Sequence, residues 1–81
     1  MIKVLFFAQT REILGLDEIE VEGHFATVQA LRDSLATRSD KWALAMEPER
    51  LLMAVNQTIV QPEASVADGD EVAFFPPVTG G

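Results

Sequence analysis

MIKVLFFA, residues 1–8, decides the fold, because its alternating pattern predicts a strand that is apolar on both faces. The expected faces carry Ile2, Val4 and Phe6 on one side and Lys3, Leu5 and Phe7 on the other. EVAFF, residues 71–75, has the same property, with Val72 and Phe74 opposite Ala73 and Phe75. A layer of helices covers only one face of a small sheet, so the two stretches together predict an exposed apolar patch on the other face.

The patch is expected to carry Leu5, Phe7 and Phe75, with the alternate residues turned toward the helices. Burial of one phenylalanine side chain stabilises a complex by roughly 1.5 to 3 kcal/mol, so such a patch could anchor a specific partner. The alternative is that a second helix or a loop folds across this face. Arg11 follows the strand, and it belongs either to the rim of the patch or to the ordinary solvated surface.

The first half of the intervening chain predicts one further strand and two helices after a short helical turn. TREILG, residues 10–15, is that turn, and DEIEVEG, residues 17–23, predicts a half-exposed strand at a sheet edge. Residues 28–39 predict an amphipathic helix capped by Thr27. Its outward residues are expected to be Gln29, Arg32, Asp33 and Thr37. A shorter helix over residues 41–46 is expected to be capped by Asp40, stopped by Pro48, and buried through Trp42, Ala45 and Met46.

The second half predicts strands. LLMAVN and TIVQ flank Asn56 and Gln57 and predict a hairpin, and Asp68, Gly69 and Asp70 predict a turn before the last strand. The expected fold class is therefore α+β, with a small mixed sheet of about five strands packed on one main helix plus a short helix. A single domain over residues 1–75 and an extended, flexible tail over residues 76–81 are expected.

The composition excludes several classes of function. The net charge is −7, from 13 acidic and 6 basic residues, which disfavours nucleic acid and anionic membranes as partners and favours a basic protein surface. No run approaches the roughly 18 apolar residues of a membrane span, and no signal-peptide layout opens the chain, so a cytoplasmic location is expected. With 81 residues, one core is expected and no elaborate cleft.

Side-chain catalysis and metal binding have few residues to use. The chain has no cysteine and one histidine, His24, which excludes thiolate nucleophiles, thiolate metal sites and histidine clusters. No tyrosine and only three serines are present, so a Ser/His/Asp triad is a poor hypothesis. No metal and no bound cofactor are expected.

The last six residues are suited to entering a pocket on another protein. They read Pro76, Pro77, Val78, Thr79, Gly80 and Gly81, and when extended they span about 20 Å. The prolines stiffen the base of the tail, and the glycines, without a Cβ, pass through constrictions that exclude other residues. The alternative is an inert chain end, since two terminal glycines occur by chance in roughly half a percent of chains.

The longer string DGDEVAFFPPVTGG, residues 68–81, resembles the MoaD family, the small subunit of molybdopterin synthase. MIKVLFFAQTRE at residues 1–12 and LLMAVNQ at residues 51–57 extend the resemblance over essentially the whole chain. This family belongs to the ubiquitin-like β-grasp sulfur carriers, so the resemblance implies a β-grasp fold.

The resemblance also implies a reaction at the chain end. The carboxylate of Gly81, next to Gly80, would be adenylated at the expense of ATP and then converted to a thiocarboxylate. Its sulfur would pass to cyclic pyranopterin monophosphate during molybdenum cofactor biosynthesis. The chain would be a sulfur donor that is not catalytic alone, and ATP would be used by the activating enzyme.

Two partners are implied by the resemblance. One is the large synthase subunit, in a heterotetramer of two small and two large subunits, and the other is an adenylating enzyme of the E1-like family. The residues expected to contact them are Leu5, Phe7, Arg11, Phe75, Pro76, Pro77, Val78 and Thr79.

Three alternatives stay open at this point. A ubiquitin-like protein modifier would use the same activation step but would be joined to lysines through Gly81. A carrier of the thiamin pathway shares the terminal glycine pair, although the FFPPVTGG ending favours the molybdopterin family. A plain interaction domain would use the patch and have an inert tail.

Overall fold

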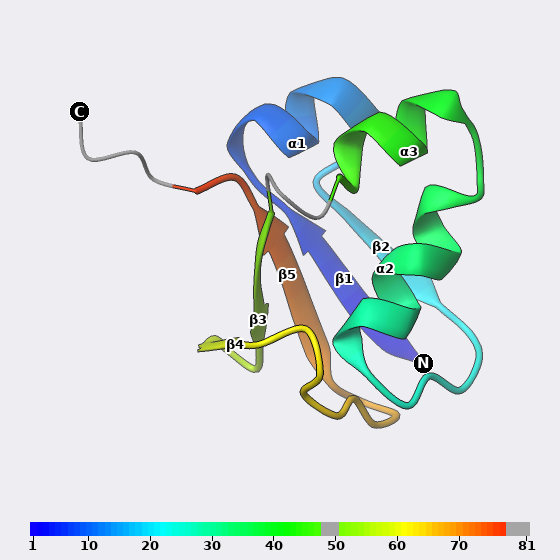
Figure 1. Cartoon of the computed structure of the whole chain (residues 1–81), viewed down its shortest axis with the longest axis vertical. Coiled ribbons are helices and arrows are strands. Elements are labelled where there is room, and N and C mark those ends of the chain that lie inside the picture. The colour runs from blue at the N-terminus through cyan, green and yellow to red at the C-terminus, as the bar shows by residue number, and fades with distance from the viewer. Residues whose placement is uncertain (48–50, 78–81) are drawn as a thin grey trace.

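Five strands form one mixed sheet in the order β2-β1-β5-β3-β4 in the computed structural model, which describes residues 1–47 and 51–77 (Figure 1). The strands are β1 (Ile2–Phe6), β2 (Glu18–Val21), β3 (Leu52–Val55), β4 (Thr58–Val60) and β5 (Glu71–Phe75). The two strands with apolar faces, β1 and β5, lie side by side in the middle and run parallel. This confirms the predicted α+β class with a sheet of about five strands.

Tight turns lie next to this central pair of strands. The two-residue turn at Asn56 and Gln57 joins β3 to β4, and both residues have positive φ, 50° and 70°, as the right-handed twist of a hairpin favours. Gly69, with φ 90°, turns the chain into β5. β2 is an edge strand, as its alternating glutamates predict.

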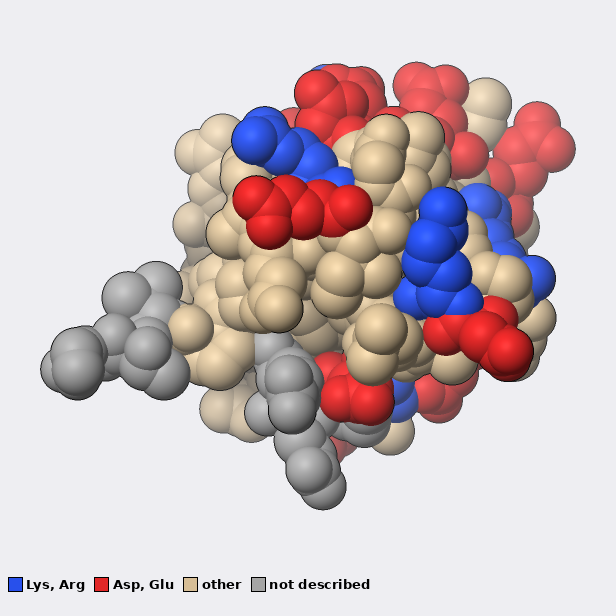
Figure 2. Space-filling view, turned by 90° about the horizontal axis from the view of Figure 1, so that it is seen from above, with Lys and Arg blue, Asp and Glu red and all other residues tan. Residues whose placement is uncertain are grey.

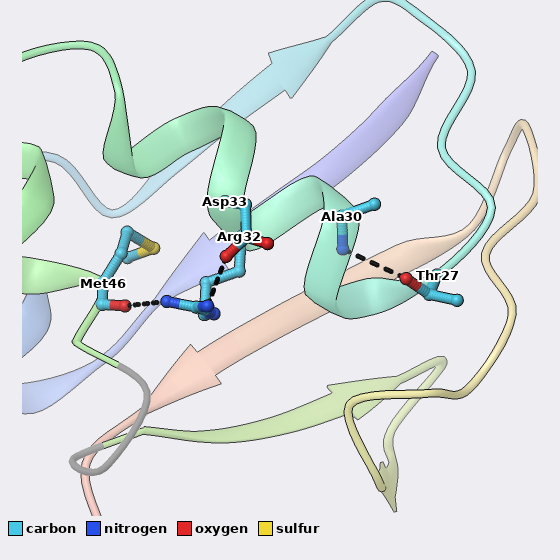
Figure 3. Close-up of polar contacts among 5 residues, drawn as sticks. All are labelled: Thr27, Ala30, Arg32, Asp33 and Met46. Carbon is cyan, nitrogen blue, oxygen red and sulfur yellow. Dashed lines mark hydrogen bonds and ion pairs between the residues drawn. The ribbon is translucent and has the colours of Figure 1, made fainter.

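Three helices accompany the sheet in the described residues: α1 (Ala8–Leu14), α2 (Val28–Ala36) and α3 (Asp40–Ala45). The described part of the chain therefore contains two short helices, α1 and α3, beside the main helix α2, whereas the expected fold class had one short helix. α1 ends at Gly15 in the left-handed conformation, and the hydroxyl of Thr27 accepts from the Ala30 N–H at 3.1 Å, which confirms the predicted cap of α2 (Figure 3).

The core lies between the sheet and the helices. Ile2, Val4, Phe6, Val72 and Phe74 are all at most 1% exposed and form the inner face of the sheet. Leu31 and Leu35 of α2 and Trp42 of α3 are buried in the same cluster, and the Phe6 and Trp42 rings meet edge to face at 5.6 Å. The predicted division of residues between the two sheet faces is confirmed for both central strands.

The prediction that Arg32 faces solvent is wrong, because this side chain is only 7% exposed. Its Nη1 donates to the Met46 carbonyl at 2.6 Å, and its Nη2 pairs with Asp33 (Figure 3). The helical periodicity of α2 alone cannot show that α3 packs on this side and ends in a carbonyl without an intrahelical partner. The arginine therefore ties the end of α3 to α2.

The start of α3 also differs from the prediction. Ser39 caps it, with its hydroxyl accepting from the Trp42 N–H at 3.3 Å, and Asp40 is the first helical residue. An acidic side chain in the first turn still favours the helix electrostatically. The predicted stop at Pro48 lies outside the described residues. Among the described residues, no helix is both long and apolar enough to cross a membrane.

Candidate partner-binding surface

The parallel pairing of β1 and β5 brings two predicted site residues to one end of the sheet. Phe6 is opposite Phe74 in the register, so Phe7, directly after β1, and Phe75, the last residue of β5, are at the same end of the sheet. Phe7 keeps an extended backbone, with φ −130° and ψ 157°, and so continues the alternation toward the outer face. The same end of the sheet is where residue 76 continues the chain.

The outer face carries an apolar surface that we call the outer patch, defined as Leu5, Phe7, Leu52, Ile59 and Phe75. Directly paired residues share a face, and the register pairs Leu5 with Ala73, Ala73 with Ala54, Ala54 with Ile59, and Phe75 with Leu52. Phe7, Leu52 and Ile59 are 46%, 37% and 66% exposed, and Leu5 and Phe75 are partly buried. Large apolar side chains grouped in this way mark a surface for association.

Sequence reasoning found three of these five residues and missed Leu52 and Ile59. Both belong to the hairpin, whose turn was predicted, but the order of strands in the sheet was not. Only the pairing of β3 with β5 puts Leu52 beside Phe75. The available signal was the adjacent apolar pair Ile59 and Val60, whose side chains must point to opposite faces of a strand.

Acidic side chains border the outer patch on the β2 side. Glu18 is paired with Leu5 in the register and Glu20 with Lys3, so both glutamates share the outer face with the patch. Lys3 and Glu18 approach to 3.8 Å on the exposed surface, a pair that contributes little to stability. The surroundings therefore favour a partner with basic groups beside an apolar centre.

Arg11 lies one helical turn beyond Phe7, and its backbone N–H donates to the Phe7 carbonyl at 3.4 Å. The side chain is exposed and borders an open pocket with Gly15, Leu16 and Asp17. Its role at the rim of the patch stays a prediction.

The predicted tail residues divide into two groups. Pro76 is partly buried and lines a pocket with residues of α1 and α3, and Pro77 is exposed. Val78, Thr79, Gly80 and Gly81 lie outside the described residues. Their proposed roles at the chain end stay predictions.

The opposite end of the sheet is held by a polar network around Asp70. The Ala67 N–H donates to its carboxylate at 2.8 Å, and the Asn56 side-chain amide donates to it at 3.1 Å. The Ala67 hydrogen bond, followed by that of Asn56, holds the pKa of Asp70 below its ordinary value of 3.8. The side-chain Oδ1 of Asn56 in turn accepts from the Glu71 N–H at 3.0 Å, so this network orients the start of β5.

Within residues 1–47 and 51–77, no group of three or more His, Cys, Asp or Glu side chains is placed to hold a metal ion. The features that the structure brings together are thus an apolar sheet face, an acidic border and the start of the C-terminal segment. The mixed five-stranded sheet with its helices has the fold of the ubiquitin-like β-grasp class of proteins.

Comparison with known proteins gives the family. The model of the ThiS family matches residues 4–81, and the chain belongs to this family. It is 63% identical over 81 residues to the molybdopterin synthase sulfur carrier subunit of Escherichia coli strain K12, with 100% of both chains covered.

Two solved structures share the fold. A putative molybdopterin converting factor, subunit 1, from Pyrococcus furiosus is 31% identical with a TM-score of 0.76, covering 95% of this chain and 97% of that chain. A complex of subunits 1 and 2 of the molybdopterin-converting factor from Helicobacter pylori includes a chain that is 21% identical with a TM-score of 0.68, covering 99% of this chain and 97% of that chain. At that identity the second likeness shows the fold alone.

Proposed function

We propose that this protein is the sulfur carrier subunit of molybdopterin synthase and that the α-carboxyl group of Gly81 is its reactive group. The full-length similarity to the Escherichia coli carrier supports the assignment. The observation that carries the mechanism is the pairing of β1 with β5, which puts Phe7 and Phe75 beside the start of the C-terminal segment. A partner bound to the outer patch is then adjacent to the segment that it must receive.

A carboxylate is a poor electrophile, because it is anionic and resonance-stabilised. In the proposed reaction the Gly81 carboxylate oxygen attacks the α-phosphate of ATP on an adenylating enzyme and releases pyrophosphate. A sulfur nucleophile then displaces AMP from the acyl-adenylate, which leaves a thiocarboxylate. The large synthase subunit next binds the carrier, and the thiocarboxylate sulfur bonds to cyclic pyranopterin monophosphate. Water then hydrolyses the resulting thioester, which leaves the sulfur on the pterin and restores the Gly81 carboxylate. Because the activating step consumes ATP inside the cell, we place the cycle in the cytoplasm.

The outer patch has the properties that this cycle requires. Its apolar centre supplies binding energy that can be used by two successive partners, the adenylating enzyme and the large subunit. Its acidic border favours basic partner surfaces and fast association. A shared surface also makes the two complexes mutually exclusive, and a ternary complex of all three proteins on size-exclusion chromatography would contradict this part of the proposal.

The test is intact-mass spectrometry of the protein after incubation with the adenylating enzyme, ATP and a sulfur donor. We expect the mass gain of one oxygen replaced by one sulfur. A protein modifier would instead yield conjugates of higher mass, and a plain interaction domain would yield no change. Either of those results would refute the proposed function.

Two tail variants sharpen the test. One additional glycine after Gly81 moves the carboxyl group by about 3.5 Å, and a misplacement of about 1 Å already costs roughly 100-fold in rate, so loading should be lost. Gly81→Ala should slow loading less, because it adds only a methyl group. If the lengthened protein is loaded at the normal rate without being trimmed, the terminal carboxyl group is not the reactive group.

A further inference from the structure

The two edges of the sheet differ in charge. β2, at one edge, carries Glu18 and Glu20 on the outer face. β4, at the other edge, belongs to the β3–β4 hairpin, and residues 51–62 contain no charged side chain, although the chain has 13 acidic and 6 basic residues. Charged side chains commonly protect an edge strand against pairing with another chain, so β4 is the edge that lacks this protection.

The register of the hairpin shows which main-chain groups of β4 are free. Val55 and Thr58 close the two-residue turn, so their main-chain groups are directed at each other. In an antiparallel ladder the next pair, Ala54 and Ile59, is not hydrogen-bonded, and the N–H and C=O groups of Ile59 are therefore directed away from β3. Among the described residues, no main-chain group of another element donates to Ile59 or accepts from it.

The Ile59 side chain is exposed beside these free groups. It is 66% exposed, more than any other large apolar side chain in the described part of the chain, and it lies on the outer face. In Figure 1, β4 lies at the opposite side of the sheet from β2 and apart from α1 and α3. An open strand edge and an exposed apolar side chain together favour the addition of another strand.

The charge of the protein limits how two copies can meet. Figure 2 looks onto the α1 and α3 end of the molecule and shows several groups of Lys, Arg, Asp and Glu side chains there. With a net charge of −7, two copies repel each other, and glutamates of two β2 strands would face like charges. A contact through the hairpin instead places no charged side chain of β3 or β4 at the interface.

A second copy of β4 complements this edge. When two β4 strands lie antiparallel about a two-fold axis at Ile59, the N–H of each Ile59 meets the C=O of the other. Residues directly opposite each other share a face, so the two Ile59 side chains also pack together. The two-fold axis makes one short strand complementary to itself.

We propose that two copies of this protein associate through antiparallel pairing of β4 with β4, centred on Ile59. The two sheets become one continuous sheet, with both outer patches on one face and both sets of helices on the other. Because Ile59 belongs to the outer patch, a partner that covers the whole patch displaces the second copy, and the dimer is a resting form of the free protein. The pairing needs no other protein, so it does not depend on the proposed function.

Sedimentation equilibrium of the full-length protein measures the association. A strand of three residues buries little area, so we expect a Kd of about 0.1 mM, with the average mass rising toward that of a dimer at about 1 mM. The Kd should decrease as the salt concentration rises, because salt screens the repulsion between the two acidic copies. A monomer at every concentration would overturn the proposal and leave this edge to a strand of another protein.

Ile59→Lys and Leu16→Lys form a matched pair of variants. Both replace an exposed aliphatic side chain and change the net charge equally, but Leu16 is 40% exposed and lies outside the sheet. Ile59→Lys puts two ammonium groups opposite each other and should raise the Kd about tenfold or more, whereas Leu16→Lys should leave it within about twofold. Circular dichroism melting checks that both variants are folded. Equal effects on the Kd would contradict pairing at β4.

Amide hydrogen exchange followed by NMR distinguishes edge pairing from the stacking of two outer patches. The Ile59 N–H is directed at solvent in the monomer, so it should exchange faster than the N–H groups of Thr58 and Val60. Raising the protein concentration from about 0.05 to about 1 mM should slow exchange at Ile59 about threefold and leave the other two unchanged. Association without any slowing at Ile59 would show that the copies meet elsewhere, and the proposal would be wrong.

Discussion

Asp70 shows at the scale of a single residue how a turn can depend on one ionised carboxylate. The hydrogen bonds from Ala67 and Asn56 favour its charged form and hold its pKa below 3.8. The unfolded chain therefore binds more protons than the folded chain in the acidic range. By linkage, this carboxylate stabilises the fold fully above about pH 3.8, and the contribution is lost as the pH falls through the lowered pKa.

We expect Asp70→Asn, which mimics the protonated side chain, to lower the midpoint of thermal unfolding at neutral pH. The difference from the original protein should shrink as the pH falls below 3.8. The measurement is circular dichroism melting over a pH series. A difference that stays constant down to the lowest pH would show that the hydrogen-bonded carboxylate is not the cause.

At the scale of elements, Arg32 joins α2 to the end of α3. Its guanidinium is buried, it donates to the Met46 carbonyl, and its Nε has no partner in the described part of the chain. A hydrogen bond from a charged group contributes about 1.5 to 3 kcal/mol, and Met46 also belongs to the hydrophobic core. The position of α3, and with it one wall of the pocket beside Pro76, depends on this contact.

Arg32→Ala should lower the free energy of unfolding by about 2 kcal/mol, because it removes the donor and leaves a carbonyl without its partner. Urea titration followed by the fluorescence of Trp42, which lies in α3, measures the loss and reports on that helix directly. Arg32→Lys keeps one donor and should lose less. Equal stability of Arg32→Ala and the original protein would mean that water replaces the guanidinium without cost.

At the scale of the whole molecule, the two faces of the sheet have different roles. The inner face contributes to the stability of the fold, and the outer face is the proposed binding surface. Phe74 is fully buried against the helices, while Phe75 is on the outer face, paired with Leu52. The two phenylalanines are one residue apart, so they provide a matched pair of substitutions. Truncation of the first should affect folding, and truncation of the second should affect binding.

Phe74→Ala should cost about 3 to 5 kcal/mol of stability, through lost burial and the cavity that remains. Phe75→Ala should leave the fold intact and weaken binding to the large subunit by about 2 to 4 kcal/mol. Urea unfolding and calorimetric titration measure the two quantities. Should Phe75→Ala collapse the fold, the assignment of this residue to a binding surface is wrong.

Most of the local structure could be predicted, because it depends on short patterns. The alternation in β1 and β5, the cap at Thr27 and the turn at Asn56 and Gln57 each involve a few neighbouring residues. Arg32 could not be predicted, since its burial depends on a helix that lies elsewhere in the chain. The same holds for Leu52 and Ile59, whose membership in the outer patch depends on strand order.

The sequence by itself determined the α+β class, the two-faced central strands, the absence of a side-chain nucleophile of the cysteine type, and the resemblance to sulfur carriers. The first three follow from residue type and spacing, which are local properties, and the last is a resemblance carried by residues 1–12, 51–57 and 68–81. Only the tertiary structure decided that Phe7 and Phe75 end side by side, that the hairpin enlarges the patch, and that α1 and α3 form a pocket against Pro76. Such contacts join residues far apart in the chain, and they exist only once the strands have paired and the helices have packed.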